Sequence, residues 1–133
     1  MPQIEALLYL SLLKESIILS MKLLSIQDYS IYGQCSSTVI LPIASSYGIE
    51  TVALPSAILS THTSGFKDYV VIDLTKNLKD ILSHWKKEKL SFDALVTGYI
   101  ASPSQFDIIL EAKKKFVKGT YFLDPAMADE GKM

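Results

Sequence analysis

Short apolar segments alternate along the chain with longer segments in which apolar residues recur every three to four positions. Each short segment predicts a β-strand, because a brief apolar run bounded by polar or turn residues is typical of a buried strand. Five segments fit this description, at residues 22–27, 50–54, 69–74, 93–97 and 120–123. The pattern does not determine where segment 69–74 lies in the sheet.

The longer segments predict helices over residues 37–47, 77–89 and 103–117. In segment 77–89 the apolar positions 78, 81, 82 and 85 share one helical face. Ser102 is a candidate N-cap, with Pro103 at the first helical position and lysines at 113–115 in the last turns. Pro42 lacks a backbone donor, so we expect the first helix to be kinked or to begin late.

Alternating strands and helices predict an α/β fold, Rossmann-like, with a mostly parallel sheet and flanking helices. In such sheets ligands bind beyond the carboxyl ends of the strands. Polar residues collect at these ends, so we expect a small-molecule pocket there. The candidate residues are Asp28, Ser30, His62, Thr63, Tyr99, Asp124 and Asp129.

Each candidate also has a structural interpretation that the sequence leaves open. Asp28 and Ser30 could cap a turn, His62 could be a hydrogen-bonded loop residue, and Tyr99 could be core packing. Asp124 and Asp129 suit Mg²⁺, which takes one or two protein carboxylates, but they could equally be turn formers.

Composition narrows the class of protein. The 133 residues suffice for about one domain. A net charge of −1 argues against a nucleic-acid-binding protein, in which an excess of lysine and arginine is expected. The single cysteine, Cys35, excludes an internal disulfide, and we expect a structural thiol there rather than a nucleophile. Near the start, Glu5, Lys14 and Glu15 interrupt the apolar stretch, which argues against a transmembrane helix. We therefore expect a soluble, cytoplasmic protein without a membrane partner.

The two ends of the chain suggest an incomplete domain. Residues 1–21 predict an N-terminal extension, since Met21 and Lys22 precede an apolar strand and could form a second start. At the other end, the last predicted strand has no crossover helix to cover it, which natural domains rarely tolerate. We therefore expect a truncated fold.

Four ordered segments, LLSIQDYSIYGQCS (23–36), ALPSAILSTHTSGF (53–66), DALVTGYIAS (93–102) and LDPAMADEGK (123–132), resemble the pyridoxal/pyridoxamine kinases of the ribokinase-like superfamily. The resemblance implies that residues 22–133 are the N-terminal half of a ribokinase-like kinase domain. It also implies ATP-dependent phosphorylation of the 5′-hydroxymethyl group of a B6 vitamer: pyridoxal, pyridoxamine or pyridoxine.

The same resemblance assigns roles to the candidate residues. Asp28, Ser30, His62, Thr63 and Tyr99 would bind the substrate. Asp124 and Asp129 would lie near Mg²⁺ and the ATP phosphates, although Ala128 replaces a glycine usual in the family. The family's catalytic base belongs to a later Gly-Asp motif that this chain lacks. We therefore expect this polypeptide to be an inactive fragment.

Two alternatives stay open at this point. One is a hydroxymethylpyrimidine kinase, which shares the superfamily and overlaps in substrate. The other is a non-catalytic, vitamer-binding remnant. In either kinase interpretation the partners are the small-molecule substrate and ATP, and the resemblance favours a homodimer.

Overall fold

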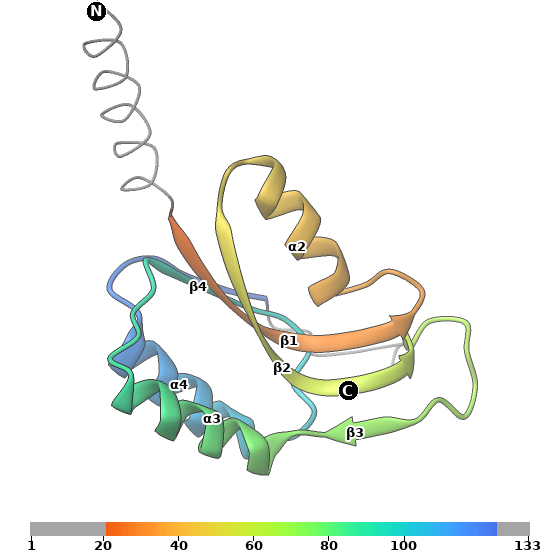
Figure 1. Ribbon diagram of the computed structural model, residues 1–133. Helices are drawn as coiled ribbons and strands as arrows, with labels where there is room; N and C mark the ends of the chain where they lie inside the picture. The colour runs from red at the N-terminus through yellow and green to blue at the C-terminus, as the bar shows by residue number, and fades with distance from the viewer. Residues whose placement is uncertain (1–20, 125–133) are drawn as a thin grey trace, which may run out of the picture.

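The computed structural model describes residues 21–124, which form a five-stranded sheet with helices on both of its faces (Figure 1). The strands are β1 (Lys22–Tyr32), β2 (Glu50–Thr61), β3 (Val71–Asp73), β4 (Ala94–Thr97) and β5 (Tyr121–Leu123). They lie in the order β3-β2-β1-β4-β5, and every pairing is parallel except that between β2 and β3. The predicted α/β fold with a mostly parallel sheet is confirmed, and segment 69–74 proves to contain an antiparallel edge strand.

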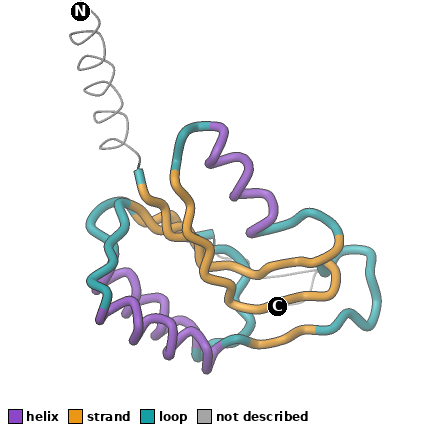
Figure 2. Tube along the Cα trace, viewed as in Figure 1, coloured by secondary structure: helices purple, strands orange, loops and turns teal. Residues whose placement is uncertain are grey.

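Within residues 21–124, three helices cover the sheet: α2 (Ser37–Ser46), α3 (Thr75–Lys87) and α4 (Gln105–Phe116). Helix α2 lies on one face, and α3 and α4 lie together on the other (Figures 1 and 2). The apolar side chains of β1 follow this division, because successive residues of a strand point to opposite faces. Leu24 and Ile26 belong to the larger core cluster with α3 and α4, whereas Leu23 packs with Ala44 of α2.

Strands β1 and β2 are longer than the sequence predicted. The first strand was expected to end at Gln27 and the second at Leu54, but β1 continues to Tyr32 and β2 to Thr61. The expected ends came from polar residues and a proline, which usually stop a buried strand. In the folded chain the two strands continue to pair, so they extend together beyond the last paired residue of β4, Thr97.

Two expectations about helix starts differ from the structure. Helix α2 begins at Ser37, the first residue of the predicted segment, so of the two alternatives expected from Pro42, a kink or a late start, the late start is wrong. The predicted start of the last helix is wrong as well, because α4 begins at Gln105. Ser102 and Pro103 instead form a preceding turn whose carbonyl oxygens accept the amides of Gln105 and Phe106, both at 3.1 Å.

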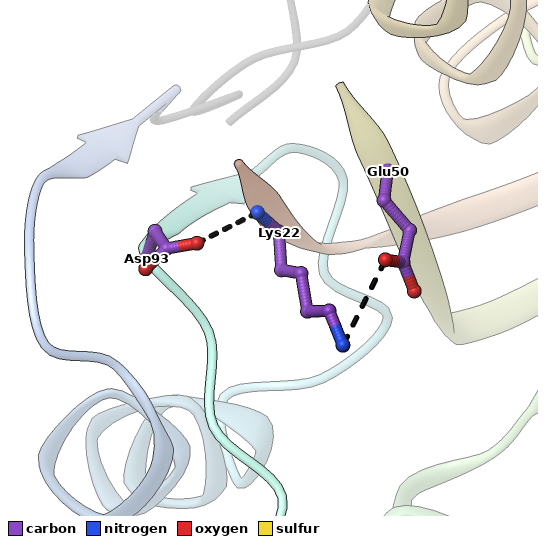
Figure 3. A network of polar contacts seen from close by, with 3 residues as sticks. All are labelled: Lys22, Glu50 and Asp93. Atoms are coloured by element: carbon purple, nitrogen blue, oxygen red, sulfur yellow. Dashed lines mark hydrogen bonds and ion pairs between the residues drawn. The ribbon is translucent and has the colours of Figure 1, made fainter. Parts of the chain in front are cut away.

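A small polar group ties together the amino ends of the strands (Figure 3). The Lys22 amide donates to Asp93 Oδ2 at 2.8 Å, and Lys22 Nζ lies 3.7 Å from Glu50 Oε2. Because the Lys22 and Glu50 side chains are about half exposed, this ion pair contributes little to stability. The group lies at the opposite end of the parallel strands from the predicted ligand site.

Two sequence predictions fall largely outside the described residues. The proposed extension over residues 1–21 is described only at Met21, and Asp129 lies beyond Asp124, the last described residue. Within residues 21–124, no helix is long and apolar enough to cross a membrane.

Candidate functional site

Asp28 and Ser30 form a buried polar pair on β1. Their exposed fractions are 3% and 1%, and Ser30 Oγ donates a hydrogen bond of 2.7 Å to Asp28 Oδ2. Both residues lie inside the strand, so the interpretation that they cap a turn at its end is wrong. A buried carboxylate is costly unless it is hydrogen-bonded, so the Ser30 hydroxyl both stabilises Asp28 and sets its orientation.

Strand β2 carries an extra residue next to Asp28. The register between β1 and β2 shifts between Gln27 and Tyr29, so that Ser56 and Ala57 lie opposite Asp28 alone. We call Ser56 and Ala57 the β2 bulge. Such irregularities redirect nearby side chains and are frequent beside binding sites. Both bulge residues are fully buried, so the polar pair on β1 lies next to a closely packed part of β2.

His62 and Thr63 lie beyond the end of β2, at the far tip of the β1–β2 pair. The His62 amide donates to the Tyr32 carbonyl oxygen at 3.0 Å, which joins the two strand ends. Its half-buried imidazole packs edge-to-face against Phe66, with ring centroids 4.9 Å apart. His62 is thus held by its backbone and by an aromatic contact. The described contacts do not join it to the Asp28–Ser30 pair.

Replacing Gly33 by alanine should displace the His62 ring. A Cβ atom on Gly33 would lie 2.1 Å from His62 Cδ2, and Gly33 has φ +75°, which alanine rarely adopts. We expect a loss of about 1 kcal/mol in the free energy of unfolding from backbone strain, together with a shift of the His62 ring resonances by NMR. Gly65→Ala is the matched control, since Gly65 has φ +80° and an added Cβ would meet no atom of residues 21–124 within 4 Å. Equal ring shifts in both variants would contradict the prediction.

Tyr99 follows the end of β4 and approaches β2 through its backbone. The Tyr99 carbonyl oxygen accepts a 2.7 Å hydrogen bond from Ser56 Oγ. The preceding Gly98 packs against Gln27, because an added Cβ would lie 2.5 Å from Gln27 Oε1. The half-buried Tyr99 is therefore bonded to the β2 bulge, the same segment that lies opposite Asp28.

A polar network that the sequence pattern did not predict lies behind this loop. The Gln105 side chain is fully buried and bonds to residues of β2, β3, α3 and the β4–α4 loop, with partners Ser56, Asp73, Thr75 and Ala101. One signal was available in the sequence. Gln105 occupies the same buried helical face as Ile108, Ile109 and Ala112, where a polar residue needs an explanation.

Asp73, which belongs to this network, should make stability depend on acid pH. Hydrogen bonds from the Thr75 hydroxyl and amide, with a smaller one from Gln105, lower the pKa of Asp73. The ionised carboxylate is therefore favoured by folding, and its contribution is lost as pH falls through the folded-state pKa, below about pH 4. In urea titrations between pH 5 and 2.5, we expect Asp73→Asn to lose less stability than the wild type. If the free energy of unfolding fell by the same amount between pH 5 and 2.5 in the wild type and in Asp73→Asn, this assignment would be contradicted.

Of the predicted acidic pair, the structure describes only Asp124. It follows β5, its side chain is exposed, and its amide donates to the Thr97 carbonyl oxygen at 3.2 Å. Among residues 21–124, no three His, Cys, Asp or Glu side chains are grouped so as to hold a metal ion. One carboxylate still fits Mg²⁺ that is bound mainly by water and nucleotide phosphates. Asp124 is therefore compatible with such an ion.

A hollow of about 260 Å³ lies elsewhere, between the outer surfaces of α3 and α4. Its lining includes Lys79, Lys86 and Lys115, the last of which pairs with Glu111. This hollow belongs to the outer helical layer and contains none of the predicted site residues.

Comparisons with known proteins give matches among solved structures. No protein-family model matches the sequence, and no curated protein matches it. A protein assigned as a phosphomethylpyrimidine kinase from Bacteroides thetaiotaomicron, crystallised with pyridoxal, is 36% identical with a TM-score of 0.80. The match covers 86% of this chain and 40% of that one. Pyridoxal kinase from Lactobacillus plantarum is 30% identical with a TM-score of 0.77, over 85% of this chain and 41% of that one. The chain has the fold of the pyridoxal kinase family.

The resemblance to pyridoxal kinases seen in the sequence is thereby confirmed. A pyridoxal kinase from Leishmania donovani, in complex with ADP and ginkgotoxin, has a TM-score of 0.67 at 21% identity, which shows the shared fold alone. The match to it covers 86% of this chain and 42% of that one. The chain thus spans about two fifths of the length of these three kinases.

Proposed function

We propose that this chain is the vitamer-binding part of an ATP-dependent kinase that phosphorylates the 5′-hydroxymethyl group of a B6 vitamer. The observation that carries the proposal is the buried Asp28–Ser30 pair beside the β2 bulge, to which Tyr99 is bonded. The proposal is supported by the similarity to a protein crystallised with pyridoxal and to a pyridoxal kinase.

The chemistry of this pair suits an aromatic ring with polar substituents. Ser30 holds Asp28 Oδ2 and thereby orients the carboxylate, which would accept a hydrogen bond from the ring nitrogen or a ring hydroxyl. Tyr99 would contact the ring from the β4 side. His62 and Thr63, at the tip of the β1–β2 pair, would contact its other substituents.

Phosphoryl transfer depends mainly on in-line positioning and charge neutralisation. ATP would supply the phosphoryl group, and Mg²⁺ would neutralise its charge. Asp124, at the carboxyl end of β5, would face the metal-bound phosphates, and Asp129 would assist it. In this proposal the residues of β1 and β2 bind the vitamer, which accepts the phosphoryl group. The residues after β5 lie near ATP, which donates it.

The test is binding and turnover by the 133-residue chain. We expect isothermal titration calorimetry to detect binding of pyridoxal, pyridoxamine or pyridoxine to the chain. We expect a coupled kinase assay with MgATP to detect no turnover. We expect no turnover because the chain spans only about two fifths of the length of the kinases that it matches. Absence of binding by all three vitamers would sink the proposal, and robust turnover would show that the described site is catalytically sufficient.

A hydroxymethylpyrimidine kinase is the second candidate. One matched protein is assigned as a phosphomethylpyrimidine kinase, although it was crystallised with pyridoxal. The same titration with hydroxymethylpyrimidine separates the two candidates. Tighter binding of hydroxymethylpyrimidine than of every B6 vitamer would favour the pyrimidine kinase.

A further inference from the structure

The Gln105 side chain extends from the first residue of α4 into the interior of the protein. It is fully buried, whereas glutamine is mostly found on protein surfaces. The other buried residues of α4 that line this face are Ile108, Ile109, Ala112 and Phe116. A polar residue in this row brings a desolvation cost, which its hydrogen bonds must offset.

The amide group of Gln105 uses both its oxygen and its nitrogen. Oε1 accepts from the Ala101 amide at 3.1 Å, and Nε2 donates to the Ser56 carbonyl oxygen at 2.9 Å. Nε2 also lies 2.9 Å from Thr75 Oγ1 and 3.3 Å from Asp73 Oδ1. A backbone amide can only donate and a backbone carbonyl can only accept, so these two backbone partners fix the orientation of the side-chain amide.

The two backbone partners of Gln105 belong to the two sides of the candidate site. Ser56 is part of the β2 bulge, opposite Asp28. Ala101 lies two residues after Tyr99, in the β4–α4 loop. The Ser56 hydroxyl also joins β2 to this loop directly, because it donates a hydrogen bond of 2.7 Å to the Tyr99 carbonyl oxygen. A single side chain therefore links the segment that faces Asp28 to the loop that carries Tyr99.

We propose that Gln105 is a positioning residue that sets the separation between Asp28 and Tyr99 and thereby the affinity for the ligand. The inference rests on the proposed function only in taking the ligand to be a B6 vitamer. Gln105 acts through Ser56 and Ala101 and makes no contact with the vitamer itself. A leucine at this position would fill a similar volume, but it would leave the Ser56 carbonyl and the Ala101 amide without this partner.

The first measurement is pyridoxal affinity, by calorimetry on the 133-residue chain. For Gln105→Leu we expect affinity to fall by about tenfold or more, since losing buried hydrogen bonds shifts the two sides of the site. The matched control is Ile109→Val, which removes one methylene from the same buried helical face. We expect it to lower the melting temperature and to leave the affinity unchanged. Equal affinities of wild type and Gln105→Leu would overturn the proposal.

The second measurement is amide hydrogen exchange, which does not depend on the identity of the ligand. In Gln105→Leu the Ala101 amide should exchange faster. The Gly98 amide bonds to the Ile26 carbonyl oxygen at 3.1 Å and should keep its protection. Unchanged exchange at Ala101 would overturn the positioning role. If the wild type fails to bind pyridoxal, the proposed function fails, and the exchange result still decides whether Gln105 holds the loop.

A second variant covers the case in which Gln105→Leu does not fold. Gln105→Glu keeps an acceptor for the Ala101 amide but loses the donor to Ser56 and places a second carboxylate beside Asp73. We expect it to preserve the protection of Ala101 and still to weaken pyridoxal binding by about tenfold. Wild-type affinity in this variant would overturn the proposal, because the link to the β2 bulge would then be dispensable.

Discussion

Replacing Asp28 by alanine is expected to weaken pyridoxal binding by about tenfold to a hundredfold. Asp28 is 3% exposed, and Ser30 orients its carboxylate with a 2.7 Å hydrogen bond. Hydrogen bonds to a charged group are worth about 1.5–3 kcal/mol, and each 1.4 kcal/mol is a factor of ten in affinity. Calorimetric titration of the folded variant with pyridoxal measures the loss.

Two further variants make the Asp28 result specific. Cys35→Ser changes an exposed thiol near the same strand, so we expect affinity close to that of the wild type. Ser30→Ala removes the hydroxyl that orients Asp28 and should give a smaller loss than Asp28→Ala. Thermal unfolding of each variant shows whether it is folded at the titration temperature. If Cys35→Ser abolished binding and Asp28→Ala did not, the assignment of the substrate site would be wrong.

Replacing Leu24 by alanine should cause the largest loss of stability among these variants. Leu24 lies on β1, the central strand of the sheet, and is fully buried in the cluster that β1 forms with α3 and α4. Truncating a buried leucine removes apolar contacts and leaves a cavity, which costs about 3–5 kcal/mol. Urea denaturation measures this as a lower midpoint with an unchanged slope.

The matched control for Leu24 is another leucine on the surface. Leu110 lies on α4 with 56% of its surface exposed, so its replacement by alanine removes little buried area. We expect Leu110→Ala to change the free energy of unfolding by less than about 0.5 kcal/mol. Similar losses for the two variants would show that β1 is not the centre of the core.

The regular elements were well predicted wherever the periodicity of apolar residues was strong. The apolar face at 78, 81, 82 and 85 predicted a helix over 77–89, and the structure has α3 at Thr75–Lys87. The alternation of strands and helices predicted a mostly parallel sheet, which the parallel pairings of β1 with β2, β1 with β4 and β4 with β5 confirm. These predictions succeed because each depends on local spacing and on the burial of one face.

The strand and helix ends were predicted less well, because they depend on partners distant in the sequence. Asp28 was expected to end a strand, yet pairing with β2 carries β1 on to Tyr32. Ser102 and Pro103 have the typical sequence of a helix start, but the helix begins at Gln105, whose side chain reaches Ser56 across the interior. Local propensity cannot report such a contact, since 49 residues separate the two in the chain.

The sequence by itself determined the α/β class, the order of the elements and the resemblance to pyridoxal kinases. These depend on short-range periodicity and on ordered motifs, which the chain carries whatever its folded form. Only the tertiary structure decided that Asp28 and Ser30 are buried strand residues, that β3 is antiparallel, and that Gln105 links β2 to the β4–α4 loop. The physical reason is that burial and hydrogen-bond partnership are set by residues that meet only when the sheet and its helices pack together.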